Sequence, residues 1–264
     1  MASSSSEPGV FRQTFDVRYP DADASGYLRL TALLNLLQVC AGDHAGELGF
    51  DYHKNKAEGV FWVLTRLSAR FDAWLAWPGA LTVDTWVRQP QGLMALRDFR
   101  FGDSGGWAGR ASSAWVLLKN KRPQRLNEWM ARSHPARPEA PAEETPLLLP
   151  PFELERQAER RAEPLYRQTH NVHADWEDID LNGHVNNVRA VGWCLSQHDA
   201  DFLRGWRPVS LDANFLAEMF WGEAFMIVRD ELPGSEETRV FDYLVVRDGD
   251  QTATLRLRMV FRKS

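Results

Sequence analysis

The order of apolar and polar residues predicts one helix followed by several strands in the first half of the chain. Apolar and polar positions alternate from Phe11 to Tyr19, which is typical of a half-buried strand. A polar turn leads into the stretch from Leu30 towards Ala45, which is apolar on nearly every side and therefore predicts a buried helix. Strand-like stretches separated by turn sequences follow at Phe61 to Phe71, Leu81 to Arg88, Leu93 to Phe101 and Trp107 to Leu118. This arrangement predicts an α+β fold with an antiparallel sheet.

The regular pattern ends between residues 123 and 164, where prolines alternate with Ala and Glu. Such a composition predicts a partly extended linker, with a short charged helix from Phe152 to Ala162. We therefore expect an N-terminal domain over residues 8–122, a linker over 123–164 and a C-terminal domain over 165–264.

The second half of the chain repeats the first. Asp21-x-Asp23-x-Ser25-Gly26-Tyr27 aligns with Asp178-x-Asp180-x-Asn182-Gly183-His184, and both precede a predicted helix. Trp77-Pro78-Gly79 likewise aligns with Trp221-Gly222 before a strand in each half. The repeat predicts two copies of one domain, packed as a pseudo-dimer.

The two copies differ in their titratable groups. Asn182, His184 and Glu218 of the second half stand where the first half has Ser25, Tyr27 and Trp74. We therefore expect the C-terminal half to perform the chemistry and the N-terminal half to shape an apolar binding site.

The main candidate chemistry lies between Trp176 and Trp193. Asp180, Asn182 and His184 alternate with apolar or small residues, so a short extended or turning segment would direct their side chains the same way. Helix capping is the alternative interpretation of such residues. Apolar residues at helical spacing follow from Val185 to Leu195, which predicts a helix whose N-terminal amides lie beside His184 and suit an oxygen that becomes negative.

The run Asp-Ile-Asp-Leu-Asn-Gly-His-Val-Asn-Asn-Val, followed by Gly192 and Trp193, resembles the catalytic segment of the acyl-acyl-carrier-protein (acyl-ACP) thioesterases of plants and bacteria. The resemblance implies a double hotdog fold, in which each half is a curled antiparallel sheet wrapped around a central helix. It also implies hydrolysis of fatty acyl-ACP thioesters to free fatty acid and ACP, with the acyl chain largely in the first hotdog. The family's catalytic set falls on Asp180, Asn182, His184 and Glu218.

One position departs from the family pattern. Many plant members have a cysteine directly after the catalytic glutamate, whereas this chain has Met219, which cannot be a nucleophile. We therefore expect direct hydrolysis, in which His184 and Glu218 activate a water molecule while Asn182 and helix amides bind the carbonyl oxygen. Asp180 either orients this network or acts on the carbonyl carbon, and which carboxylate is the base stays open.

Two groups of residues are candidates for substrate binding. Large rings in the first half are expected to close off the acyl site: Phe61, Trp62, Trp74 and Trp86. A basic run is expected to grip the carrier protein or its phosphopantetheine phosphate, unless it is only a solvated charged face: Lys119, Lys121, Arg122 and Arg125, with Arg156, Arg160 and Arg161 further on.

Composition excludes several classes of partner. The chain has 264 residues, 44% of them hydrophobic and 25% charged, and a net charge of −5, so neither nucleic acid nor an anionic membrane is expected. Cys40 and Cys194 give no disulfide framework and no metal-ligand spacing, so we expect no metal, no organic cofactor and a cytoplasmic setting. No secretion signal or membrane-spanning run is evident. Free edge strands leave a homodimer open.

Two other functions are also consistent with the sequence. The first is an acyl-coenzyme A thioesterase of the same fold, for which a tight basic pocket is expected instead of a broad basic surface. The second is a non-catalytic acyl-binding double hotdog, which would not need titratable groups at the thioester.

Overall fold

A computed structural model describes residues 9–50, 52–88, 90–125 and 166–264. The chain divides into two compact units, one in residues 1–147 and one in residues 148–264. The predicted linker over 123–164 lies outside the described residues except for its first three positions, and the helix predicted within it lies wholly outside them. Both therefore stay predictions.

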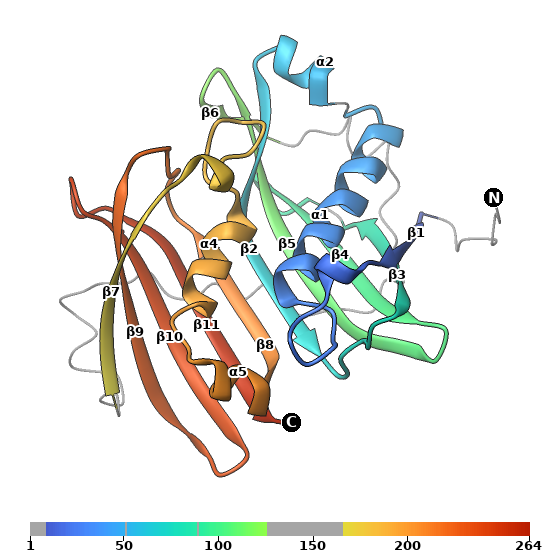
Figure 1. The fold of residues 1–264 in the computed structure, drawn as a ribbon. Helices are drawn as coiled ribbons and strands as arrows, with labels where there is room; N and C mark the ends of the chain where they lie inside the picture. The colour runs from blue at the N-terminus through green and yellow to red at the C-terminus, as the bar shows by residue number, and fades with distance from the viewer. Residues whose placement is uncertain (1–8, 51, 89, 126–165) are drawn as a thin grey trace. The chain divides into compact units, whose positions relative to one another are not determined.

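The first unit is an antiparallel sheet with one long helix against it (Figure 1). Its strand order is β1-β3-β4-β5-β2, with a short β6 beside β5. The strands are β1 (Phe11–Val17), β2 (Val60–Phe71), β3 (Gly79–Val87), β4 (Met94–Asp103), β5 (Gly106–Lys119) and β6 (Arg122–Pro123). The helices are η1 (Tyr19–Asp21), α1 (Leu30–Glu47) and α2 (Tyr52–Ala57). The expected strands and long helix are confirmed, whereas α2 was not predicted.

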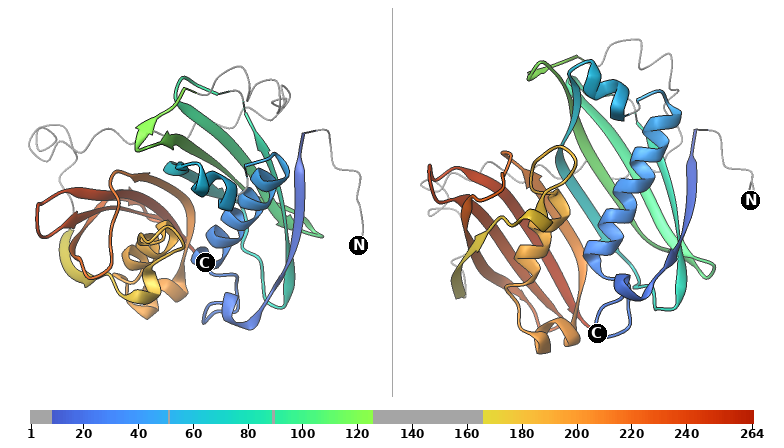
Figure 2. Two further views of the ribbon diagram at one scale, coloured as in Figure 1. Left: turned by 90° about the horizontal axis from the view of Figure 1, so that it is seen from above. Right: turned by 45° about the horizontal axis from the view of Figure 1, so that its top comes forward.

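Helix α1 is buried on one face and not all round. Its buried residues recur at helical spacing: Leu30, Leu33, Leu34, Leu37, Cys40, Ala41 and His44. On the other side Val39 is 47% exposed, and Asn35 and Asp43 are exposed with it. The prediction of a helix buried on every side is therefore wrong, because polar residues share the face of Val39. Helix α1 lies along the sheet of the first unit, as both views of Figure 2 show.

The second unit repeats the same arrangement. Its strands are β7 (Tyr166–His173), β8 (Trp206–Phe215), β9 (Ala224–Ser235), β10 (Thr238–Arg247) and β11 (Ala253–Lys263), in the order β8-β11-β10-β9-β7. Its helices are η2 (Trp176–Asp178), α4 (Asn187–Leu195) and α5 (Ala200–Gly205). Read from the opposite end, this strand order matches that of the first unit. The internal repeat is therefore confirmed as a repeat of structure, and each unit has the hotdog arrangement of a helix on an antiparallel sheet.

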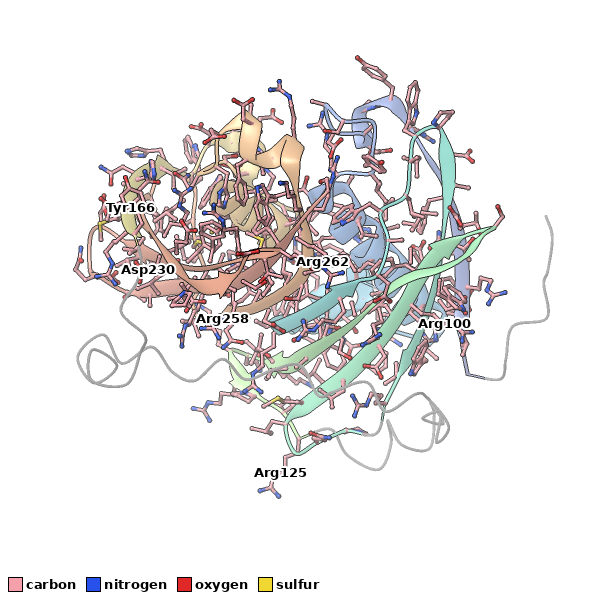
Figure 3. The ribbon with its side chains drawn as sticks, turned by 90° about the horizontal axis from the view of Figure 1, so that it is seen from below. Arg100, Arg125, Tyr166, Asp230, Arg258 and Arg262 are labelled. Carbon is pink, nitrogen blue, oxygen red and sulfur yellow. The ribbon has the colours of Figure 1, made fainter. Side chains whose placement is uncertain are left out.

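Each sheet also carries ion pairs on the face directed away from its helix. Asp84 accepts hydrogen bonds from Arg12 at 2.6 Å and from Arg100 at 2.8 Å, each from a neighbouring strand. In the second unit Asp230 pairs with Arg167 at 2.6 Å. Arg258 pairs with Asp242 on the neighbouring strand, and Figure 3 labels Asp230 and Arg258. The carboxylates are nearly inaccessible to water, so these bidentate pairs compensate buried charge and fix the strand register. Within the described residues, no helix has the length and hydropathy that a bilayer crossing requires.

Candidate active site

The predicted motif forms a tight turn that ends directly before α4. The amide of Asn182 donates to the Asp180 carboxylate at 2.8 Å, and the amide of Gly183 donates to the Asp180 carbonyl at 2.9 Å. Gly183 has φ of 80°, a left-handed conformation that suits glycine. Asp180 also donates its amide to the carbonyl of His184 at 2.8 Å, which closes the turn. The sequence therefore folds here as an Asx turn that displays His184 at its exit.

The structure brings His184 and Glu218 together. Nδ1 of His184 lies 3.7 Å from Oε1 of Glu218, and both side chains remain accessible, at 32% and 52% exposure. The distance is longer than a hydrogen bond but short enough to close when substrate binds. Asp180 and Asn182 precede His184 on the same turn, but neither side chain makes a hydrogen bond or ion pair with it in the described part of the chain. Asn182 is exposed, and its side-chain amide has no hydrogen-bond partner among the residues that the structure describes.

Three of the amides near the N-terminus of α4, where donors to the substrate oxygen were expected, are paired within the protein. Asn186 is the N-cap of α4, and its side chain accepts a hydrogen bond from the amide of Val188 at 2.8 Å. The amide of Asn186 donates to the Asp178 carbonyl, and that of Val185 donates to the Met219 carbonyl, each at 2.8 Å. These donors are already paired, so they are not available for a substrate oxygen.

The segment from Leu216 to Glu223 carries Glu218 and contains two residues that the sequence did not single out. The ring of Phe220 meets the imidazole of His184 edge to face, with centroids 5.0 Å apart. Glu223 accepts a hydrogen bond from the Phe220 amide at 2.8 Å and pairs with Arg247 at 3.2 Å. Phe220 and Glu223 lie in the same segment as Glu218, whereas Arg247 lies at the end of β10. Only the repeat could have indicated them, because the first unit has different residue types at the corresponding positions.

Neither sulfur group near the motif is a nucleophile. Met219 is buried, and its carbonyl accepts the amide of Val185. Cys194 lies on α4 and is completely buried, and this burial raises the pKa of its thiol far above the ordinary value. Burial likewise raises the pKa of the Cys40 thiol to about 12. Both thiols therefore stay protonated and inert at neutral pH.

An apolar pocket lies between α1 and the sheet of the first unit. Its lining comes from the helix and from strands β2, β4 and β5: Leu34, Leu37, Gln38, Ala41, Leu64, Leu67, Phe99, Ser113 and Trp115. None of the four predicted rings is part of this lining. Trp62 packs edge to face on Phe50, and Trp74 packs on Phe71, while Phe61 is partly exposed. Trp86 is 1% exposed and lies on the sheet face opposite α1, because its neighbour Thr85 bonds Arg97 on the helix side.

The predicted basic run forms an exposed hairpin. Lys119 on β5 pairs with Arg122 on β6, and Lys121 at the turn has positive φ. All four predicted cations are exposed: Lys119, Lys121, Arg122 and Arg125. The unpredicted helix α2 adds Lys54 and Lys56, and its end is tied to the hairpin by the Asn120 amide, which donates to the Gly59 carbonyl at 3.1 Å. The remaining predicted cations, Arg156, Arg160 and Arg161, lie outside the described residues.

Comparisons with known proteins cover both units. The family model "Acyl-ACP thioesterase N-terminal domain" matches residues 8–131, and the model "Acyl-ACP thioesterase C-terminal domain" matches residues 162–262. The chain is 30% identical over 199 residues to the chloroplastic palmitoyl-acyl carrier protein thioesterase of Arabidopsis thaliana, an alignment that covers 70% of this chain and 46% of that protein. It is 27% identical over 208 residues to oleoyl-acyl carrier protein thioesterase 1 of the same plant, covering 73% and 56%. The chain thus spans about half the length of the curated relatives it matches.

Solved structures share the fold over nearly the whole chain. An acyl-ACP thioesterase from Bacteroides thetaiotaomicron has a TM-score of 0.76 at 24% identity, covering 96% of this chain and 98% of that one. The 12:0-ACP thioesterase from Umbellularia californica has a TM-score of 0.79 at 21% identity, covering 97% and 94%. At these identities the likeness establishes the double hotdog fold.

Proposed function

Because the chain belongs to the acyl-ACP thioesterase family, we propose that it hydrolyses fatty acyl-ACP thioesters to free fatty acid and ACP. The observation that carries this proposal is the pair of His184 and Glu218, which come from separate segments and meet with both side chains accessible. A protein that only bound acyl chains would not need a base at this place.

We propose that His184 is the general base. Glu218 lies beside Nδ1 and orients the ring, so that Nε2 can take a proton from the attacking water. The water oxygen forms a bond to the thioester carbonyl carbon, and the carbonyl oxygen becomes negative. The C–S bond then breaks, and the proton held by His184 passes to the departing thiolate. Water and thioester are thus converted into carboxylic acid and thiol, with no other reactant.

Asn182 is the proposed donor to the negative oxygen. Its side-chain amide is exposed on the turn that displays His184, whereas the amides of Val185, Asn186 and Val188 are already paired. Asp180 holds the turn through its carboxylate and adds a negative charge near the base. Removing one such oxyanion donor typically costs about a factor of 10² to 10³ in kcat.

We propose that the acyl chain lies in the apolar pocket of the first unit and that ACP docks on the basic hairpin. The pocket lining is almost wholly apolar, as an alkyl chain requires. The cations of the hairpin and of α2 are spread over an exposed surface instead of a closed pocket, which suits an acidic protein better than the phosphates of coenzyme A. We further propose a reducing, cytoplasmic setting, since both cysteines are free and buried.

The decisive experiment is hydrolysis of a series of acyl chains, each presented on ACP and on coenzyme A, by the wild type and by His184→Ala. We expect strong preference for the ACP form and loss of turnover in the variant. Equal or better use of coenzyme A would favour the acyl-coenzyme A thioesterase. Acyl binding without turnover of either substrate would identify a binding protein, and unchanged turnover by His184→Ala would exclude the proposed base. Light scattering on the same samples distinguishes a monomer from a homodimer.

A further inference from the structure

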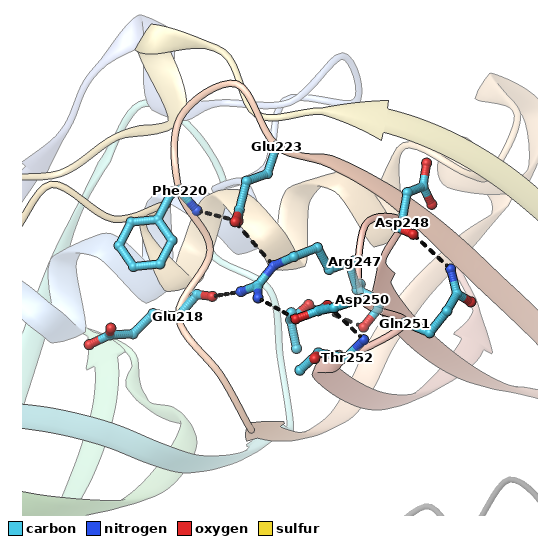
Figure 4. A network of polar contacts seen from close by, with 10 residues as sticks. Glu218, Phe220, Glu223, Arg247, Asp248, Asp250, Gln251 and Thr252 are labelled. Carbon is cyan, nitrogen blue, oxygen red and sulfur yellow. Dashed lines mark hydrogen bonds and ion pairs between the residues drawn. The ribbon is translucent and has the colours of Figure 1, made fainter.

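Arg247, at the end of β10, clamps the loop that carries Glu218 (Figure 4). Its Nη2 donates to the carbonyl oxygen of Glu218 at 2.5 Å. Its Nε lies 3.2 Å from Oε1 of Glu223, and its Nη1 donates to Oδ2 of Asp250 at 3.2 Å. The side chain is only 19% exposed. One planar guanidinium therefore joins the segment from Leu216 to Glu223 to the turn that follows β10.

The clamped loop is also tied to the His184 segment. Glu223 uses its second carboxylate oxygen to accept the amide of Phe220, whose ring lies against His184. The carbonyl of Met219 accepts the amide of Val185, the residue directly after His184. The position of the Glu218 backbone relative to His184 thus depends on a short chain of contacts that begins at Arg247.

The corresponding loop of the first unit is held in place without such a clamp. There the amide of Leu28 donates to the Leu75 carbonyl at 2.8 Å, which is the counterpart of the bond from Val185 to Met219. At the offset that aligns Trp74 with Glu218, Gly79 stands for Glu223 and Asp103 stands for Arg247. A glycine and an aspartate at these positions cannot form the clamp. The fold therefore does not require it, and it occurs only in the unit that carries the titratable residues.

Two carboxylates other than that of Glu218 face the charge of Arg247. Asp250 accepts hydrogen bonds from the backbone amide of Thr252 and from Arg247, and the first of these contributes most to holding the pKa of its carboxyl below the ordinary value. Glu223 and Asp250 face the guanidinium from two sides. Arg247 is therefore neutralised by partners other than Glu218, and the Glu218 carboxylate stays directed to His184.

We propose that Arg247 is a positioning residue for thioester hydrolysis, which fixes the Glu218 backbone so that the carboxylate stays within reach of His184. The inference rests on the proposed function. Arg247 touches neither the substrate nor the reacting atoms. Its loss is expected to lower kcat more than to raise KM, since it affects the alignment of the base and leaves the acyl pocket and the basic hairpin intact.

The experiment compares Arg247→Ala, Arg247→Lys and Arg247→Gln with the wild type on an acyl-ACP substrate. Arg239→Ala is the matched control, because Arg239 lies on the same strand and its partners, Glu231 at 2.6 Å and the ring of Trp206, do not belong to the loop that carries Glu218. Circular dichroism and thermal unfolding verify the fold of each variant. If Arg247→Ala fails to fold, Arg247→Lys and Arg247→Gln carry the comparison.

We expect Arg247→Ala to lose about 10- to 100-fold in kcat with little change in KM. Arg247→Lys should lose less, and added guanidinium ion should restore part of the activity of Arg247→Ala but not raise that of the control. Unchanged kcat, a change in KM alone, or no rescue by guanidinium in folded protein would overturn the inference while leaving the proposed function intact. Absence of turnover by the wild type would remove the proposed function and this inference with it.

Discussion

At the scale of single residues, the reaction mechanism depends on which group acts as the nucleophile. The residue after Glu218 is a buried methionine, and the nearest cysteine, Cys194, lies on the inner side of α4 with a raised thiol pKa. His184 instead faces accessible space beside Glu218. Neither sulfur group is therefore available to attack a thioester in contact with His184, which supports the proposed attack by water over a cysteine nucleophile.

Cys194→Ala should keep kcat on acyl-ACP within about a factor of two of the wild type, because a buried, protonated thiol takes no part in the reaction. The wild type should also resist inactivation by a thiol-alkylating reagent under native conditions. Steady-state kinetics and mass spectrometry of the treated protein measure both. Rapid alkylation of Cys194 accompanied by loss of turnover would contradict a water mechanism.

Substitutions can separate the structural role of Asp180 in the turn from a role in the reaction. An asparagine side chain at this position still offers an oxygen to the Asn182 amide, so Asp180→Asn should keep the turn and the thermal stability. We expect it to lose about 10² or more in kcat, because the negative charge beside the base is gone. Asp180→Ala should lose stability as well. Turnover by Asp180→Asn equal to that of the wild type would restrict Asp180 to the turn.

At the scale of elements, the end of α4 is held to its sheet by a buried polar network. His198 follows the helix, and its Nε2 bonds the hydroxyl of Tyr243 at 2.5 Å. Its Nδ1 lies 3.3 Å from Arg229, which also donates to the Gln197 carbonyl and to Gln168. Phe202, Phe241 and Phe261 surround the imidazole. Burial, assisted by the charge of Arg229, lowers the pKa of His198 to about 3.

This network predicts a loss of stability in weak acid. The folded pKa lies below the unfolded value of about 6.5, so protons bind preferentially to the unfolded chain. The stabilisation by neutral His198 is complete above pH 6.5 and is lost as the pH falls towards 3, at no more than about 1.4 kcal/mol per pH unit. In urea unfolding at pH 7 and pH 5, the wild type should lose about 1–2 kcal/mol more than His198→Gln. Equal losses in both proteins would show that His198 does not control this pH dependence.

At the scale of the whole molecule, the repeat is the feature that the sequence predicted best. The aligned runs around Asp23 and Asp180 correspond to turns of the same kind, and the carboxylate of each accepts the amide two residues on. Such turns are local, so their residue types are visible in the sequence. The same locality explains the correct strands and the correct start of α4 near Asn186.

The errors come from information that is not local. Helix α2 is short and polar, and it has no apolar repeat that would mark it. Asp84, Thr85 and Trp86 are all buried, so alternation along β3 could not reveal which face Trp86 occupies. The clamp of Arg247 joins two segments separated in the sequence, and its charged residues cannot be told from ordinary surface residues before the loop is folded. The turn that carries the motif could thus be predicted from the sequence, whereas the contacts around it and the pocket lining could not. The catalytic roles of the motif residues stay predictions.

Because the proposed acyl pocket lies in the first unit and the proposed catalytic residues lie in the second, we expect the first unit to set the preference for acyl chain length. Ala41 lines the pocket from α1, so Ala41→Leu should fill part of it and shift the preference towards shorter chains, with hydrolysis of the shortest chain retained. Val39→Leu, on the exposed side of the same helix, also introduces a leucine but outside the pocket, and it should leave the profile unchanged. Competition among acyl-ACPs of different length, with product analysis, measures the profile. An identical profile for Ala41→Leu and the wild type would mean that the chain lies elsewhere, whereas a shift with unchanged kcat on short chains would show that binding and chemistry reside in different units of one chain.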